Sequence, residues 1–315
     1  MQIPYKPRPV GARKPERSRK AADTTPVVSD TFQSFDDTRI FYSIEGPEKF
    51  TGTPLVFCYG LVCSSLHWTY QIDHFKKSHR SVWFDYRGHH NSDAPKDLKS
   101  ITIANMAKDL GLLLDELKIP KAILIGHSMG SSVALEFYRQ QPSRVGALVL
   151  SNGTPKRPLE TLLNSNNTIP GGFHLLKTIY EKSPKLFGTL WRLQRGNPVV
   201  RAIIKMGGFN PHLTPDEDID RYVSLVEDMD PGIFLQILAT YNEYDASSWL
   251  HTIQVPTLVI SGARDQITPA DRQELMSQLI PGSRLEKILH GSHCPQMDFP
   301  ELINEKIERF LNELN

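Results

Sequence analysis

The sequence lacks any apolar run of the roughly 18 residues that a membrane-spanning helix needs, and its first residues lack the apolar stretch of a secretory signal. It has only three cysteines, Cys58, Cys63 and Cys294, an odd number that suggests free thiols in a reducing compartment. Its formal net charge of +1 gives no overall bias toward nucleic acid. We therefore expect a cytoplasmic protein without a nucleic-acid partner.

Charge is unevenly distributed along the chain. Residues 1–20 carry seven basic side chains and one acidic one, with four prolines and almost no apolar periodicity. This composition predicts a disordered basic tail over residues 1–30. Most such tails are simply solvated, and weak contact with an anionic membrane surface or with nucleic acid is the alternative.

The order of apolar segments predicts one large α/β domain with an insertion. Alternating segments at Thr31–Phe35 and Arg39–Ile44 predict an antiparallel hairpin. Further strands are predicted at 54–58, 81–84, 122–125, 145–150, 255–260 and 284–289, and helices at 103–117 and from Pro300 onward. Strands that alternate with helices indicate a mostly parallel, doubly wound sheet, built from residues 31–153 and 251–315.

Residues 154–250 interrupt this alternation and carry bulky apolar side chains at mostly helical spacings. We interpret the segment as an inserted helical cap, or lid. Its part 177–205 holds seven basic residues and one acid, and its part 216–230 holds seven acids and one base. The favoured interpretation is that the two parts pair across the lid. The alternative is that the basic half docks on an anionic membrane.

The most informative stretch follows the strand at 122–125, where Gly126-His127-Ser128-Met129-Gly130 precedes a segment of helical periodicity. A serine on so tight a strand-to-helix turn needs glycine two positions before and after it, because the flanking chains nearly touch. The turn exposes the hydroxyl above the sheet edge, at the positive end of a helix. On the pentapeptide alone, Ser128 could equally be an ordinary helix cap.

Four local patterns, in order, resemble those of the α/β-hydrolase superfamily, in particular its lidded serine esterases and lipases. The first is the Tyr59-Gly60 turn, and the second is the loop that begins at Asp85. The third is the serine turn. The last comprises Gly262-Ala-Arg-Asp265 with the histidine loop His290-Gly-Ser-His293. The resemblance covers residues 31–314 except the cap.

The chemistry of a serine nucleophile agrees with this resemblance. A serine hydroxyl needs a base to take its proton, and a carboxylate that orients the base. Asp265 and His293 each follow a predicted strand, and the order Ser128, Asp265, His293 is the one expected for this fold. His290 is the competing histidine, and Asn152 stands where some family members supply the acid, although an amide cannot.

The resemblance also implies an oxyanion hole from the backbone N–H groups of Leu61 and Met129. Tyr59 replaces the family's usual histidine, and packing is its favoured role. Tyr59, Trp68 and Trp191 are candidate substrate-binding residues. Scattered histidines without metal-ligand spacing predict no metal, and the chemistry requires no cofactor.

The predicted function is a serine hydrolase that cleaves an ester or related acyl bond of a mainly apolar small molecule. A serine at position 128 separates the chain from epoxide hydrolases, which need an aspartate nucleophile. The alternatives within enzymes are a carbon–carbon bond hydrolase, an acyltransferase or a perhydrolase. The alternative outside them is a catalytically inactive ligand receptor of the same fold. The oligomeric state is not predicted.

Overall fold

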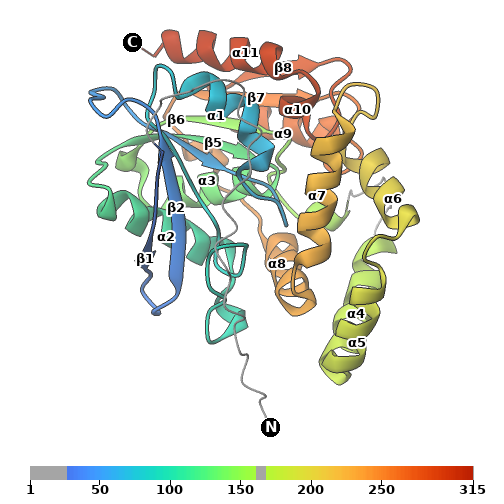
Figure 1. Ribbon diagram of the computed structural model, residues 1–315. Helices are drawn as coiled ribbons and strands as arrows, with labels where there is room; N and C mark the ends of the chain where they lie inside the picture. The colour runs from blue at the N-terminus through green and yellow to red at the C-terminus, as the bar shows by residue number, and fades with distance from the viewer. Residues whose placement is uncertain (1–26, 161–167, 315) are drawn as a thin grey trace.

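The computed structural model describes residues 27–160 and 168–314, and its centre is an eight-stranded sheet in the order β1-β2-β4-β3-β5-β6-β7-β8 (Figure 1). The strands are β1 (Val27–Gln33), β2 (Arg39–Glu45), β3 (Leu55–Cys58), β4 (Ser81–Phe84), β5 (Ala122–His127), β6 (Val145–Ser151), β7 (Thr257–Gly262) and β8 (Arg284–Ile288). Strand β2 is antiparallel to β1 and β4, and every other pairing is parallel. The predicted mostly parallel sheet with an antiparallel start is therefore confirmed.

Helices lie on both faces of this sheet. Helices α1 and α11 pack together on one face, and α2 and α3 pack together on the other (Figure 1). The helices of the sheet layer are α1 (Thr69–Phe75), α2 (Ile103–Glu116), α3 (Met129–Gln140), α9 (Ala270–Leu279), α10 (Pro295–Asp298) and α11 (Pro300–Asn312). No helix in the described ranges is long and apolar enough to cross a membrane.

The sequence explains why the central strands form. All side chains of β3, β4 and β5 are buried, as expected for parallel strands covered on both faces. The run of β-branched and other apolar residues in β5 satisfies this requirement. Helix α2 begins where the Thr102 hydroxyl accepts a hydrogen bond from the Asn105 N–H at 3.1 Å.

Two predicted boundaries require correction. Residues 27–30, assigned to the disordered tail, form the first half of β1, and Val27 to Gln33 pair with Glu45 to Arg39. All four side chains are exposed, so no buried apolar face marks this edge segment in the sequence. Residues 1–26 lie outside the described part of the chain. The strand predicted from Val255 begins at Thr257, because Pro256 has no N–H to give to a sheet ladder.

Between β6 and β7 the chain forms the helices α4 (Thr168–Lys182), α5 (Pro184–Leu193), α6 (Pro198–Gly208), α7 (Asp216–Asp228) and α8 (Pro231–Glu243). We call α7 and α8 the inner helices and α4–α6 the outer helices, because α7 and α8 lie between the sheet and the others in Figure 1. Helix α6 packs on α7, α5 on α8 and α4 on α5. These helices fall in the predicted cap segment, and their role as a lid stays a prediction.

The inner helix α7 is tied to the sheet layer by polar contacts. The Tyr70 hydroxyl of α1 donates to Asp218 at 2.6 Å, and the Thr214 hydroxyl, just before α7, donates to Asp298 at 2.6 Å. The Tyr222 ring of α7 stacks on His67 at a centroid distance of 5.3 Å. The inner helices are therefore held beside the carboxyl ends of the strands.

Candidate active site

Ser128 occupies the strained turn between β5 and α3. Its φ of 53° lies in the left-handed region, which a residue with a side chain enters only at an energetic cost. A Cβ on Gly130 would lie 2.2 Å from the Cys58 carbonyl oxygen, and one on Gly126 would lie 2.6 Å from the Gly130 oxygen. Both positions therefore require glycine, as the sequence predicted. The Ser128 N–H donates to the Ser151 carbonyl at 2.9 Å and holds the turn on the sheet.

His293 and Asp265 meet at the same edge of the sheet. The His293 Nδ1 lies 2.8 Å from Oδ2 of Asp265, and both residues are buried. The competing His290 is exposed, and its carbonyl accepts a bond from Asn210. Within the described contacts, the Ser128 hydroxyl makes no hydrogen bond to His293, a separation common in sites without substrate. The structure thus brings the base and the acid together, and His127, the residue before Ser128, contacts the backbone of His293.

The Asp265 carboxylate is held in its charged form. Burial by itself would raise its pKa, but the His293 ring and hydrogen bonds from Asn152 and Thr268 lower the pKa below its usual value. The Asn152 amide donates to Oδ2 at 2.6 Å, and the N–H groups of Ile267 and Thr268 donate to Oδ1 at 2.8 and 2.9 Å. A charged acceptor beside Nδ1 fixes the His293 tautomer with its other nitrogen free to accept a proton.

Two further histidines join the serine turn to the histidine loop. The His127 Nε2 lies 2.8 Å from the His293 carbonyl oxygen, which can only accept, so this nitrogen carries the proton. Burial lowers the pKa of His127 to about 3, so the ring is neutral and its Nδ1 accepts from Nδ1 of His67 at 3.1 Å. The Gly60 N–H, 3.4 Å from the same His67 nitrogen, then cannot donate to it. This bonding fixes the backbone at His293.

The loop after β3 lies directly against the serine. A Cβ on Gly60 would come within 3.2 Å of the Ser128 Cβ. Val62 has a φ of 53°, an unusual conformation for a β-branched residue and a sign of a constrained loop. Among the described contacts, neither the Leu61 N–H nor the Met129 N–H has an acceptor. Both groups are therefore available to an oxygen at Ser128, and their role in an oxyanion hole stays a prediction.

Two of the three candidate substrate-binding residues lie in the core. Tyr59 is fully buried; its hydroxyl donates to Asp85 at 3.2 Å and accepts from the Tyr86 N–H at 3.0 Å. Trp68 is also fully buried, and its Nε1 donates to the Cys58 carbonyl at 3.1 Å. These contacts agree with packing, the favoured role of Tyr59. Contact of Tyr59 or Trp68 with substrate stays a prediction.

Trp191 lies on α5, where its ring packs against Phe234 of α8 at a centroid distance of 5.1 Å and against Phe187 at 6.2 Å. Its buried Nε1 has no hydrogen-bond partner among the described residues. The ring joins an outer helix to an inner one. Its contact with substrate stays a prediction.

Two buried hydroxyls beside Ser128 were not predicted from the sequence. The Tyr241 hydroxyl, on α8, and the Ser132 hydroxyl, one turn after Ser128 on α3, lack hydrogen-bond partners among the described residues. Burial raises the pKa of Tyr241, and the nearby hydroxyls of Ser128 and Ser132 act in the opposite direction. Tyr241 therefore reaches toward the serine from the inner helices. No sequence pattern marks it, because its position depends on how the inserted segment folds back.

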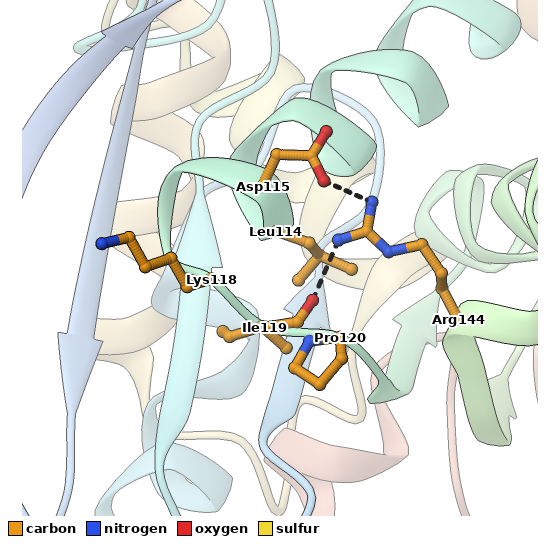
Figure 2. Close-up of a pocket in the computed structure, with 6 residues that line it drawn as sticks. All are labelled: Leu114, Asp115, Lys118, Ile119, Pro120 and Arg144. Atoms are coloured by element: carbon orange, nitrogen blue, oxygen red, sulfur yellow. Dashed lines mark hydrogen bonds and ion pairs between the residues drawn. The ribbon is translucent and has the colours of Figure 1, made fainter.

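The hollow shown in Figure 2 lies at the other end of the sheet. It is lined by Leu114, Asp115, Lys118, Ile119, Pro120 and Arg144, at the amino end of β5. The Arg144 guanidinium donates to Asp115 at 2.7 Å and to the Ile119 carbonyl at 2.9 Å. Since β5 spans roughly 20 Å, this hollow is remote from Ser128. It contains none of the predicted site residues.

Comparison with known proteins identifies the family. The family model described as alpha/beta hydrolase fold matches residues 53–300. A Bacillus subtilis protein with the provisional name 2-succinyl-6-hydroxy-2,4-cyclohexadiene-1-carboxylate synthase is 27% identical over 286 residues, which cover 89% of this chain and 97% of that protein. Epoxide hydrolase 1 of Caenorhabditis elegans is 26% identical over 263 residues, 82% of this chain and 65% of that protein.

Among solved structures, the esterase RhEst1 from Rhodococcus sp. ECU1013 has a TM-score of 0.75 at 21% sequence identity. The superposition covers 91% of this chain and 99% of the esterase, so the folds are the same. The family model extends over most of the chain, from before β3 to the start of α11. The chain therefore belongs to the α/β-hydrolase family of enzymes.

Proposed function

We propose that the protein is a serine hydrolase that cleaves a carboxylic ester or a related acyl bond through an acyl-enzyme intermediate. One observation carries this proposal. A strained Ser128 follows β5, while the paired His293 and Asp265 follow β8 and β7 at the same edge of the sheet. A serine hydroxyl needs such a base and acid to react at neutral pH.

In the proposed mechanism the Ser128 oxygen attacks the acyl carbon while His293 Nε2 takes the hydroxyl proton. Asp265 accepts from Nδ1 and stabilises the imidazolium that forms. The N–H groups of Leu61 and Met129 donate to the oxyanion. His293 then protonates the leaving group, and a water molecule, activated by the same ring, releases the acid.

Relatives of the chain bear the names of esterases, lactonases and epoxide hydrolases. Serine at position 128 favours the first two, because an epoxide-opening enzyme of this fold needs an aspartate nucleophile. A mainly apolar substrate fits the aromatic side chains of the inserted helices. The unpaired hydroxyls of Tyr241 and Ser132 would receive one hydrogen-bonding group of that substrate. A cytoplasmic location belongs to the same proposal.

The test is to treat the wild-type protein and the Ser128→Ala variant with a fluorophosphonate probe, and then to assay p-nitrophenyl esters from acetate to laurate. We expect labelling only in the wild type, and a loss of turnover of about 10⁴-fold or more in the variant. Labelling without ester turnover would instead favour a carbon–carbon bond hydrolase, an acyltransferase or a perhydrolase. If the wild type shows no labelling and no turnover, a ligand receptor is favoured.

A further inference from the structure

The outer helices expose rows of large apolar side chains. On α5 the row is Leu186, Leu190 and Leu193, at i, i+4 and i+7, and Leu193 is 73% exposed. On α6 the row is Val199, Ile203 and Met206, with the same spacing, and Met206 is 70% exposed. Residues at this spacing share one face of a helix. Each of these helices therefore presents an apolar face to solvent.

This concentration is unlike the rest of the described surface. Nine of the fifteen exposed large apolar side chains lie on the outer helices, where α4 adds Leu175, Leu176 and Ile179. The other six form no such row: three lie on β1 and the turn after it, and the rest are single residues after α6, after β8 and on α11. Scattered apolar residues are normal on a soluble protein, whereas a concentrated group marks an interaction site.

The charges of the outer helices divide into two groups. On the α6 side, Arg201 pairs with Asp220 at 2.5 Å and Lys205 with Asp216 at 2.5 Å, as the pairing interpretation of the cap predicts. The basic side chains of α4 and α5 have no ion-pair partner in the described ranges; they are Lys177, Lys182, Lys185 and Arg192. The only acid on these two helices is Glu181. An apolar surface with uncompensated positive charge results.

We infer that the outer helices dock on the surface of a lipid bilayer that contains anionic lipids. Helices of 15, 10 and 11 residues are too short to span a bilayer, but amphipathic helices with basic residues lie in its interface. Anionic headgroups would neutralise the lysines while the acyl region receives the leucines. A second copy of the same face fits less well, because symmetric pairing would place like charges together.

Docking of this kind would orient the molecule. The outer helix α5 packs on α8, and α8 carries Tyr241 beside Ser128. The outer helices would face the bilayer, with the inner helices between them and the sheet (Figure 1). The inference concerns binding to lipid and is independent of whether Ser128 is a nucleophile.

The experiment is flotation of the full chain with vesicles of phosphatidylcholine alone and of phosphatidylcholine mixed with phosphatidylglycerol, at low and high salt. We expect binding to the anionic vesicles that weakens at high salt. The double variant Leu190→Asp/Leu193→Asp should weaken binding by at least about tenfold, since each leucine loses its apolar contact. The variant Lys182→Glu/Lys185→Glu should remove the preference for anionic vesicles.

The matched control is Val28→Asp, which places the same charge at an apolar side chain that is 55% exposed and lies on β1, across the sheet from the outer helices (Figure 1). It should bind like the wild type. The proposal is overturned if the double leucine variant floats as well as the wild type, which would assign binding to the basic tail. It is also overturned if no vesicle is bound and ultracentrifugation shows a dimer that the leucine variant dissociates. Circular dichroism checks that each variant is folded.

Discussion

The sheet layer and the outer helices differ in where they place their apolar side chains. In the sheet layer, β3, β4 and β5 are completely buried, and even Arg87 is fully buried, paired with Asp109 at 2.7 Å. On α5 and α6, by contrast, rows of leucine, isoleucine, valine and methionine face solvent. The sheet layer buries its apolar side chains within the chain, whereas the outer helices leave theirs exposed. This exposed surface is the one that we propose for contact with lipid.

The inner helices stand between these two regions. Helix α8 buries Ile233, Leu235 and Ile237, and α7 buries Ile219 and Val223. Helix α8 packs in the core of the sheet layer and carries Tyr241 toward the serine, and α7 packs on Cys294 and Met297 near the histidine loop. Within the inserted segment, the inner helices α7 and α8 are thus packed on the sheet layer, and the outer helices α4–α6 carry the exposed apolar rows.

The largest expected effect is the contrast between two glycine-to-alanine variants. Gly130→Ala should destabilise the protein by about 3 kcal/mol and abolish activity, because its Cβ would lie 2.2 Å from the Cys58 oxygen. Gly188→Ala, on α5, has nothing within 4 Å of the added Cβ and should stabilise the chain by up to about 1 kcal/mol. Urea unfolding measures both. Equal effects would contradict the difference between the two regions.

Acid should destabilise the sheet layer through its buried histidines. Burial lowers the pKa of His89 and of His127 to about 3, and that of His67 well below its usual value. Below about pH 6.5 these histidines bind protons in the unfolded chain but stay neutral in the folded chain. The free energy of unfolding therefore falls as the pH falls toward 3. In this window each such histidine lowers the free energy of unfolding by about 1.4 kcal/mol for every pH unit.

Urea unfolding between about pH 8 and pH 4 measures this loss. We expect constant stability above pH 7 and a steep decline below about pH 6. The variant His89→Gln removes one titrating group and should give a shallower decline. A stability that stays level down to pH 5 would show that these rings gain protons in the folded state.

The smallest expected effect concerns Tyr241→Phe. Removal of the hydroxyl should lower kcat/KM about tenfold for esters whose acyl group carries a hydroxyl or carbonyl, with little change for plain alkyl esters. The ratio of the two rates is the readout, because a merely structural role would lower both equally. Phe234→Leu, on the same helix, serves as a control for packing and should leave the ratio unchanged.

Much of the sheet and the site was predictable from the sequence, because local constraints specify them. Glycine is required on both sides of Ser128, because a Cβ at Gly130 or Gly126 would lie 2.2 or 2.6 Å from a backbone oxygen. Such crowding leaves a clear sequence pattern. Buried parallel strands need uninterrupted apolar runs, which β5 and β6 provide. The position of each strand end in turn placed Asp265 and His293.

Other features could not be predicted, because they depend on contacts between distant segments. Tyr241 reaches Ser128 only after the inserted helices fold back onto the sheet layer. The Thr268 N–H donates to Asp265 through a turn whose conformation the sequence does not specify. The hydrogen bonds of Tyr59 and Trp68 in the core could not be predicted either, because a sequence does not show which polar groups pair with each other. The exposed rows of α5 and α6 have the same spacing as buried ones, so periodicity alone could not tell them apart.

The contact of 2.6 Å between the Asn152 amide and the Asp265 carboxylate joins the ends of two neighbouring strands. Asn152 follows β6 and Asp265 follows β7, and the pairing of Ser151 with Ile260 brings these two ends side by side. The carboxylate that faces the Nδ1 of His293 is therefore held from the adjacent strand as well as from its own loop. The orientation of the histidine depends in this way on the register between β6 and β7.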